Sequence, residues 1–159
     1  MAFEVITFEI PGNPQALKRH RAFRMGEHLR MVDPSASDKA NFLTIAFANK
    51  PDTPLDEPLH VGCTFVFDRP KSHYRTGSKS HLLKDSAPYF HTKVPDGDNL
   101  FKFIGDALEG VFWKNDSCIA KQESLKLYAN DHRPRTIVTI QPIQPLNLNW
   151  RELVNEIHQ

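Results

Sequence analysis

The sequence is poor in several features that mark special classes of protein. Only two of its 159 residues are cysteines, Cys63 and Cys118, which is too few for a disulfide scaffold or a cysteine-based zinc site. No apolar run approaches the ~20 residues of a membrane span, and the N-terminus lacks the basic segment that opens a secretory signal. We therefore expect a globular cytoplasmic protein with free thiols and no membrane partner.

Net charge is also small. The formal charge of +1 argues on its own against a nucleic-acid partner. However, residues 18–30 and 69–84 together hold ten basic residues and one acid, so they carry +9 and leave −8 on the remainder. The first segment follows the turn-rich residues 11–14, and the second combines Pro70 and Gly77 with no apolar periodicity, so we expect both to be loops. They are either ordinary solvated loops or contacts for a polyanionic backbone.

Hydrophobic periodicity predicts the main elements. We expect strands over residues 3–10, 59–67, 117–128 and 135–140, and a helix over residues 38–49. The strongest signal is one continuous apolar helical stripe, formed by Leu100, Phe103, Ile104, Ala107, Leu108 and Val111. The order of elements predicts a single α+β domain, a small mixed β-sheet packed with two main helices. A short helix is also expected in the tail over 142–159, to cover the core or a partner subunit.

The face of the second helix opposite this stripe is charged. Asp98, Lys102, Asp106 and Glu109 recur at helical spacing, and Asp96 lies just before the helix. Asp116 follows after a short turn. Because a helix of about twelve residues spans roughly 18 Å, Asp116 can meet the other acids only if the next strand runs back along the helix.

Each of these residues has an ordinary interpretation. Asp96 or Asp98 can be an N-cap, Lys102 can pair with a neighbouring acid, and Asp116 can be a turn residue. These interpretations leave unexplained why two acids share one helix start beside a lysine and near a third acid. Mg²⁺ provides a common cause, since it binds one or two carboxylates together with substrate phosphates. A calcium-binding EF-hand does not fit, because apolar Leu100 stands where an oxygen ligand is needed.

The central motif resembles a known family. Residues 95–102 read PDGDNLFK, residues 106–108 read DAL, and residues 112–117 read FWKNDS. This pattern is similar to that of the RusA family of Holliday junction resolvases, and the basic residues 70–77 resemble a loop of its phage and prophage members. The resemblance covers residues 6 to about 140. We therefore expect a RusA-like endonuclease domain over 1–141, followed by the tail.

The resemblance implies a homodimeric endonuclease that depends on Mg²⁺, with Mn²⁺ as an alternative ion, and that nicks branched four-way DNA symmetrically. It assigns Asp96, Asp98 and Asp116 as metal ligands and Lys102 as the essential lysine, and these four would be the catalytic residues. The expected DNA-binding residues are Lys18, Arg19, Arg21, Arg24, Lys71, His73, Arg75 and Lys79. This sequence departs from the family pattern at Asn115, where the family usually has Asp, and at Val94, where it often has a basic residue.

Two other functions are compatible with parts of the sequence. In a non-catalytic DNA-binding module, the basic segments suffice and the acids are caps and turns. A small-molecule phosphoesterase accounts for the acids but leaves the two basic segments unexplained. Metal-dependent cleavage distinguishes the expected nuclease from the binding module, and equal activity on a free nucleotide ester and on branched DNA would favour the phosphoesterase.

Overall fold

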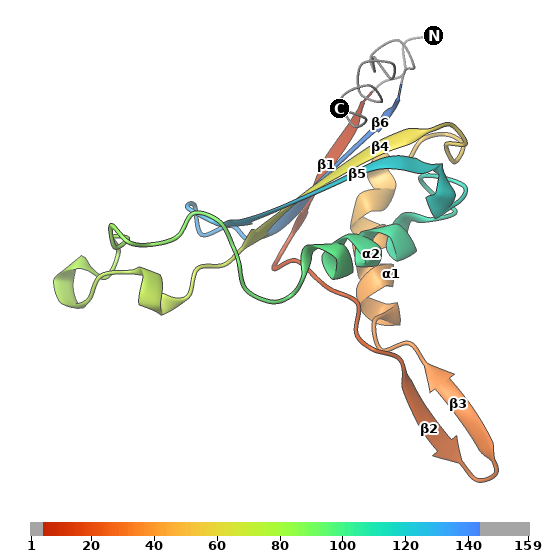
Figure 1. Ribbon diagram of the computed structural model, residues 1–159, viewed down its shortest axis with the longest axis horizontal. Coiled ribbons are helices and arrows are strands. Elements are labelled where there is room, and N and C mark those ends of the chain that lie inside the picture. Colours follow the sequence, from red (N-terminus) through yellow and green to blue (C-terminus); the bar gives the residue numbers. More distant parts are fainter. Residues whose placement is uncertain (1–4, 144–159) are drawn as a thin grey trace, which may run out of the picture.

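The computed structural model describes residues 5–143 of the protein and contains one four-stranded sheet, one separate hairpin and two α-helices (Figure 1). The sheet is formed by β1 (Ile6–Pro11), β4 (Leu59–Phe67), β5 (Ile119–Tyr128) and β6 (Arg135–Pro142). Its strand order is β1-β6-β4-β5, in which β4 and β5 are parallel and the other two pairs are antiparallel. The predicted α+β fold with a small mixed sheet is confirmed.

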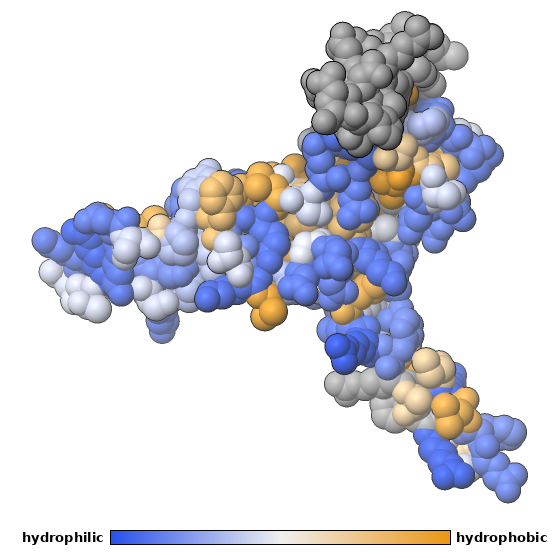
Figure 2. Space-filling model, in the orientation of Figure 1, coloured by the Kyte–Doolittle hydropathy of each residue, from blue (hydrophilic) through white to orange (hydrophobic). Residues whose placement is uncertain are grey.

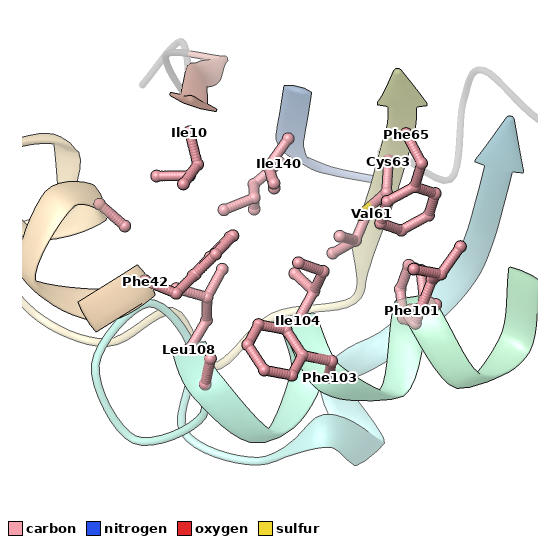
Figure 3. Close-up of a cluster of buried hydrophobic side chains, with 14 of the residues drawn as sticks. Ile10, Phe42, Val61, Cys63, Phe65, Phe101, Phe103, Ile104, Leu108 and Ile140 are labelled. Atoms are coloured by element: carbon pink, nitrogen blue, oxygen red, sulfur yellow. The ribbon is translucent and has the colours of Figure 1, made fainter. Parts of the chain in front are cut away.

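The two helices are α1 (Ala36–Ala46) and α2 (Gly97–Leu108). Their apolar side chains and those of β4 form the hydrophobic core (Figure 3). Strand β4 alternates as predicted, with Val61 and Phe65 fully buried, and the predicted stripe of α2 includes the fully buried Phe103 and Leu108. Each such side chain contributes roughly 1.5–3 kcal/mol by leaving water. This burial fixes which face of α2 remains exposed.

Parallel strands β4 and β5 are joined by a long connection that contains α2. The helix lies along β5, because a Cβ placed on Gly97 would lie 3.6 Å from Cβ of Ser124, and one placed on Gly105 would lie 3.1 Å from a carboxylate oxygen of Asp116. Residue numbers therefore rise along α2 as they fall along the segment 116–124. The segment does run back along the helix, but it brings Ser124 to the start of α2 and leaves Asp116 beside Gly105, near the end of the helix.

The first basic segment is not a loop, so that prediction was wrong. It forms an antiparallel hairpin of β2 (Arg21–Met25) and β3 (His28–Val32), which projects from the body (Figures 1 and 2). Gly26, with a φ of 64°, opens its two-residue turn, a position where hairpins favour glycine. All of β3 is exposed, so the burial-driven alternation that usually reveals a strand is missing.

The second basic segment is irregular, as predicted. Residues 69–84 contain two single-turn 3₁₀ helices, Lys71–His73 and Gly77–Lys79, and otherwise bends and turns. The helix expected in the tail lies outside the described residues and stays a prediction. Among residues 5–143, no helix is long and apolar enough to cross a membrane.

Candidate active site

The start of α2 presents two carboxylates to solvent. Asp96 precedes the helix in an extended conformation, with φ −71° and ψ 148°, and Asp98 lies in the first turn. Both residues are exposed. The Asp96 side chain makes no capping hydrogen bond, although its carbonyl accepts from the N–H of Leu100 at 3.1 Å. The ordinary interpretation of Asp96 as a side-chain N-cap is therefore not realised, and its carboxylate is available.

Asp116 is held in a defined orientation. It is half-buried in a 3₁₀ turn, Asp116–Cys118. The indole Nε1–H of the fully buried Trp113 donates to its Oδ1 at 2.8 Å, and its own backbone N–H donates to Oε1 of Glu109 at 3.2 Å. The Oδ2 atom lies only 3.1 Å from the position that a Cβ on Gly105 would take. The carboxylate is thus oriented by an indole donor and accommodated by a glycine on the neighbouring helix.

The three acids lie along one strip but do not converge at one point. Gly105, beside which Asp116 lies, follows Asp98 by seven residues, which is about 10 Å of helix. Within residues 5–143, no group of three His, Cys, Asp or Glu side chains is close enough to hold one ion. The chain alone therefore offers at most one or two of the carboxylates to a given ion.

Lys102 follows Asp98 by one helical turn and is exposed. Asp106, its neighbour on the other side, instead lies 3.8 Å from Nζ of Lys39 on α1. Across the described part of the chain, Lys102 takes part in no ion pair. Its ammonium is free to meet an anion that approaches the exposed face of α2.

Asn115 has a local structural role. Its Oδ1 accepts from the N–H of Ser117 at 2.9 Å and so caps the turn that carries Asp116. An aspartate can make the same bond, since both side chains offer an acceptor oxygen at this position. The departure from the family pattern at Asn115 therefore preserves the turn.

The segment that leads into the hairpin is hydrogen-bonded to α2. Nδ2 of Asn99 donates to the carbonyl of Leu17 at 3.2 Å, just before the hairpin. Among the predicted DNA contacts, Arg19 and Arg24 are exposed, and Arg21 lies in β2. Lys18 is also exposed, but its Nζ is 2.7 Å from Oδ2 of Asp38 and so is partly neutralised.

The second basic segment holds the remaining predicted contacts. Lys71 and Lys79 are exposed. Arg75 pairs with Asp85 at 3.0 Å. His73 is half-buried with its ring edge against Tyr128, and burial together with the nearby Arg69 lowers the pKa of its imidazole. The hairpin and this segment extend from the body in different directions, with the start of α2 between them (Figure 1).

The chain is similar to proteins of a known family. The family model described as "Endodeoxyribonuclease RusA" matches residues 11–141. The chain belongs to the RusA family. It is therefore an endodeoxyribonuclease of a family that resolves Holliday junctions and generally depends on divalent metal ions. It is also 28% identical over 137 residues to "Uncharacterized protein YqaN" of Bacillus subtilis (strain 168), an alignment covering 85% of this chain and 96% of that protein.

Three residues that position the candidate site were given no role by the sequence. Gly105 fits the apolar pattern of α2, and Trp113 lies in the quoted motif at residues 112–117, which gives it no role. Lys126 on β5 donates to the carbonyls of Lys93 and Pro95, at 2.6 and 2.7 Å, and thereby fastens the segment that leads into Asp96. Gly105 meets Asp116 where α2 packs on the returning segment, Trp113 bonds to Asp116 from three residues away, and Lys126 bonds to the segment just before α2.

One basic residue of the RusA domain is structural. Arg69 belongs to the second basic segment, yet it is only 8% exposed. Its guanidinium donates to the carbonyls of Ala129 and Pro88 and to Oδ1 of Asn130, at 2.9, 2.8 and 2.7 Å. Arg69 therefore fastens the start of the second basic segment to Pro88, just beyond its end, and to the end of β5. As a result, the +5 charge of the segment is not all available to a partner.

Proposed function

We propose that this protein is a homodimer that hydrolyses branched four-way DNA with Mg²⁺, making paired symmetric nicks at the junction. The observation that carries the proposal is the exposed strip on α2 and the neighbouring turn. It holds Asp96, Asp98, Lys102 and Asp116 without a basic partner for any of the three acids among the described ion pairs. Charged groups left unpaired beside one another fit a site that is completed by an ion and a phosphate.

The donor set suits a hard divalent ion. Its protein ligands would be the carboxylates of Asp96, Asp98 and Asp116, of which one or two would bind a given ion. Water and phosphate oxygens would be the further ligands. Carboxylate oxygens suit Mg²⁺ and Mn²⁺ alike. When bound, such an ion supplies Lewis-acid stabilisation of the charge that develops on a phosphodiester.

The remaining functions of the site would be supplied by side chains of the protein. The ammonium of Lys102 would offset negative charge on the phosphate in the transition state. Trp113 and Glu109 hold Asp116 by the two hydrogen bonds described above, so its carboxylate is oriented before substrate arrives. The exposed Arg19, Arg24, Lys71 and Lys79 would bind the DNA backbone by displacing counterions, with Arg21, Arg75, His73 and Lys18 as the remaining contacts.

A homodimer suits this substrate because resolution requires two cuts. A four-way junction has approximate twofold symmetry, and a twofold dimer presents two equivalent sites to it. Each subunit would cut one strand.

The test compares two substitutions on α2. Asp98→Asn removes a proposed ligand without changing its size, whereas Asp106→Asn alters an exposed acid of the same helix that faces Lys39. We expect Asp98→Asn to bind a synthetic four-way junction normally and to cut it at least about a hundredfold more slowly in Mg²⁺. Asp106→Asn should cut at nearly the wild-type rate. Full cleavage by Asp98→Asn would refute the assignment.

A further inference from the structure

The outer edge of β5 is open over half its length. Residues 120–125 are all exposed. Farther along, the segment before α2 occupies the edge, because the N–H of Tyr128 donates to the carbonyl of Tyr89 at 3.1 Å and the N–H of His91 donates to the carbonyl of Lys126 at 3.0 Å. Lys126 and Tyr128 thus direct their backbone groups outward.

Along a β-strand, every second residue directs its N–H and C=O groups to the same edge. The backbone groups of Gln122 and Ser124 therefore also point outward. In the part of the chain that the structure describes, neither residue has a backbone partner at this edge. An exposed row of unpaired backbone N–H and C=O groups can pair with another strand, and proteins usually cover or interrupt such an edge.

We propose that this edge pairs with the same edge of a second copy, as antiparallel β5 strands centred on Gln122. A twofold axis through this residue would join the two four-stranded sheets into one of eight strands. The partner is another copy of this chain because the side chains of β5 complement themselves in this register.

Charge selects the register. Centred on Gln122, Lys121 lies opposite Glu123 of the partner subunit, and by symmetry the pair occurs twice. Centring the pairing on Lys121 or Glu123 would place like charges directly opposite each other, which is destabilising.

Backbone geometry agrees with this choice. Because Gln122 directs its N–H and C=O outward, it would form a hydrogen-bonded pair with the partner's Gln122. The flanking pair of Lys121 with the partner's Glu123 would then be non-hydrogen-bonded, the arrangement in which opposite side chains are closer. Within one subunit Lys121 already lies 2.9 Å from Glu123, so pairing would build a cluster of four charges in which each charge neighbours two of opposite sign.

This inference rests on the homodimer of the proposed function and specifies its interface. It can be tested without DNA cleavage, so its failure is distinguishable from failure of the nuclease assignment. A dimer formed elsewhere would leave the nuclease proposal intact, and an inactive dimer would leave the interface intact.

The first experiment is a symmetric disulfide. Gln122→Cys is prepared in full-length protein carrying Cys118→Ser, and the remaining thiol, Cys63, is buried with its pKa raised to about 12. Opposite residues of antiparallel strands have Cα atoms ~4.5–5.5 Å apart, within reach of a disulfide. We expect a mild oxidant to give a covalent dimer. The control is Thr7→Cys on β1 at the opposite edge of the sheet, which should stay monomeric on a denaturing gel. Cross-linking of Thr7→Cys in place of Gln122→Cys would overturn the interface.

The second experiment mixes two charge-reversed variants. Lys121→Glu and Glu123→Lys each place two like-charge pairs across the proposed axis, so each homodimer should dissociate about tenfold more readily in sedimentation equilibrium. A mixture of the two variants restores both opposite-charge pairs and should form heterodimers of nearly wild-type affinity. A monomeric wild type, or a mixture no tighter than either variant alone, would overturn the proposal.

Discussion

Gly105→Ala tests whether the space beside α2 sets the position of Asp116. The added methyl would lie 3.1 Å from Oδ2 and 3.4 Å from Oδ1 of Asp116. Ordinary contact begins near 3.4 Å, so the carboxylate must move by roughly 0.3 Å against its 2.8 Å hydrogen bond from Trp113. A displacement of ~1 Å costs about a hundredfold in rate, so we expect junction cleavage to slow by about three- to tenfold.

Stability should respond differently from activity in this variant. Replacing glycine by alanine inside a helix is worth about 1 kcal/mol, whereas overpacking costs ~1–3 kcal/mol. The free energy of unfolding should therefore change by no more than about 2 kcal/mol, measured by urea denaturation. Slower cleavage would then not reflect unfolding.

Gly97→Ala is the matched control. It makes the same change in the same helix, but the new methyl would lie 3.6 Å from Cβ of Ser124, an ordinary contact. We expect it to cut a four-way junction at close to the wild-type rate. If Gly105→Ala also cuts at the wild-type rate, the position of Asp116 does not depend on this space and the reasoning fails.

Three further predictions concern residues around the site. Trp113→Phe removes the indole donor to Asp116 and should lower the cleavage rate about tenfold at unchanged junction binding; an unchanged rate would contradict the orienting role. Arg69→Lys breaks the fork at the base of the basic loop and should cost ~2 kcal/mol of unfolding free energy, and a loss below about 0.5 kcal/mol in urea denaturation would show that the fork is dispensable. His91 stacks on Phe67 at 3.9 Å, and burial lowers the pKa of its imidazole in the folded state. As the pH falls, His91 is protonated in the unfolded chain at a higher pH than in the folded protein. Its contribution to stability is therefore complete above about pH 6.5 and declines below it. His91→Phe should flatten the fall in thermal midpoint between about pH 7 and pH 5, and an unaltered slope would assign that fall to other groups.

Much of the body was predictable because its elements each bury one face. Helix α2 and strand β4 show strong amphipathic or alternating patterns, and most of their buried residues were predicted, although α2 ends at Leu108 before Val111 and also buries Phe101. The hairpin of β2 and β3 was not predicted, because β3 is exposed throughout and carries apolar residues such as Leu29 and Met31. Its clearest local signal was the glycine turn at Gly26.

The site was predictable in residue identity but not in arrangement. Spacing along α2 and the family motif selected the acids and Lys102. The space at Gly105 and the contacts of Lys126 depend on the segment 116–126 returning beside α2, whereas the bond from Trp113 to Asp116 spans only three residues. That return is a long-range packing result with no local sequence pattern. For the same reason, the sequence could not predict that Asp116 lies about two helical turns from Asp98.

The central claim is tested most directly by mapping cleavage of a four-way junction, with each of its four strands labelled in turn, in Mg²⁺ and in the presence of a chelator. We predict nicks at equivalent positions on two opposite strands, no cutting of a linear duplex of the same sequence, and no cutting with chelator. Nicks that fall equally on duplex and junction, or that persist after removal of divalent ions, would contradict metal-dependent junction resolution by this protein.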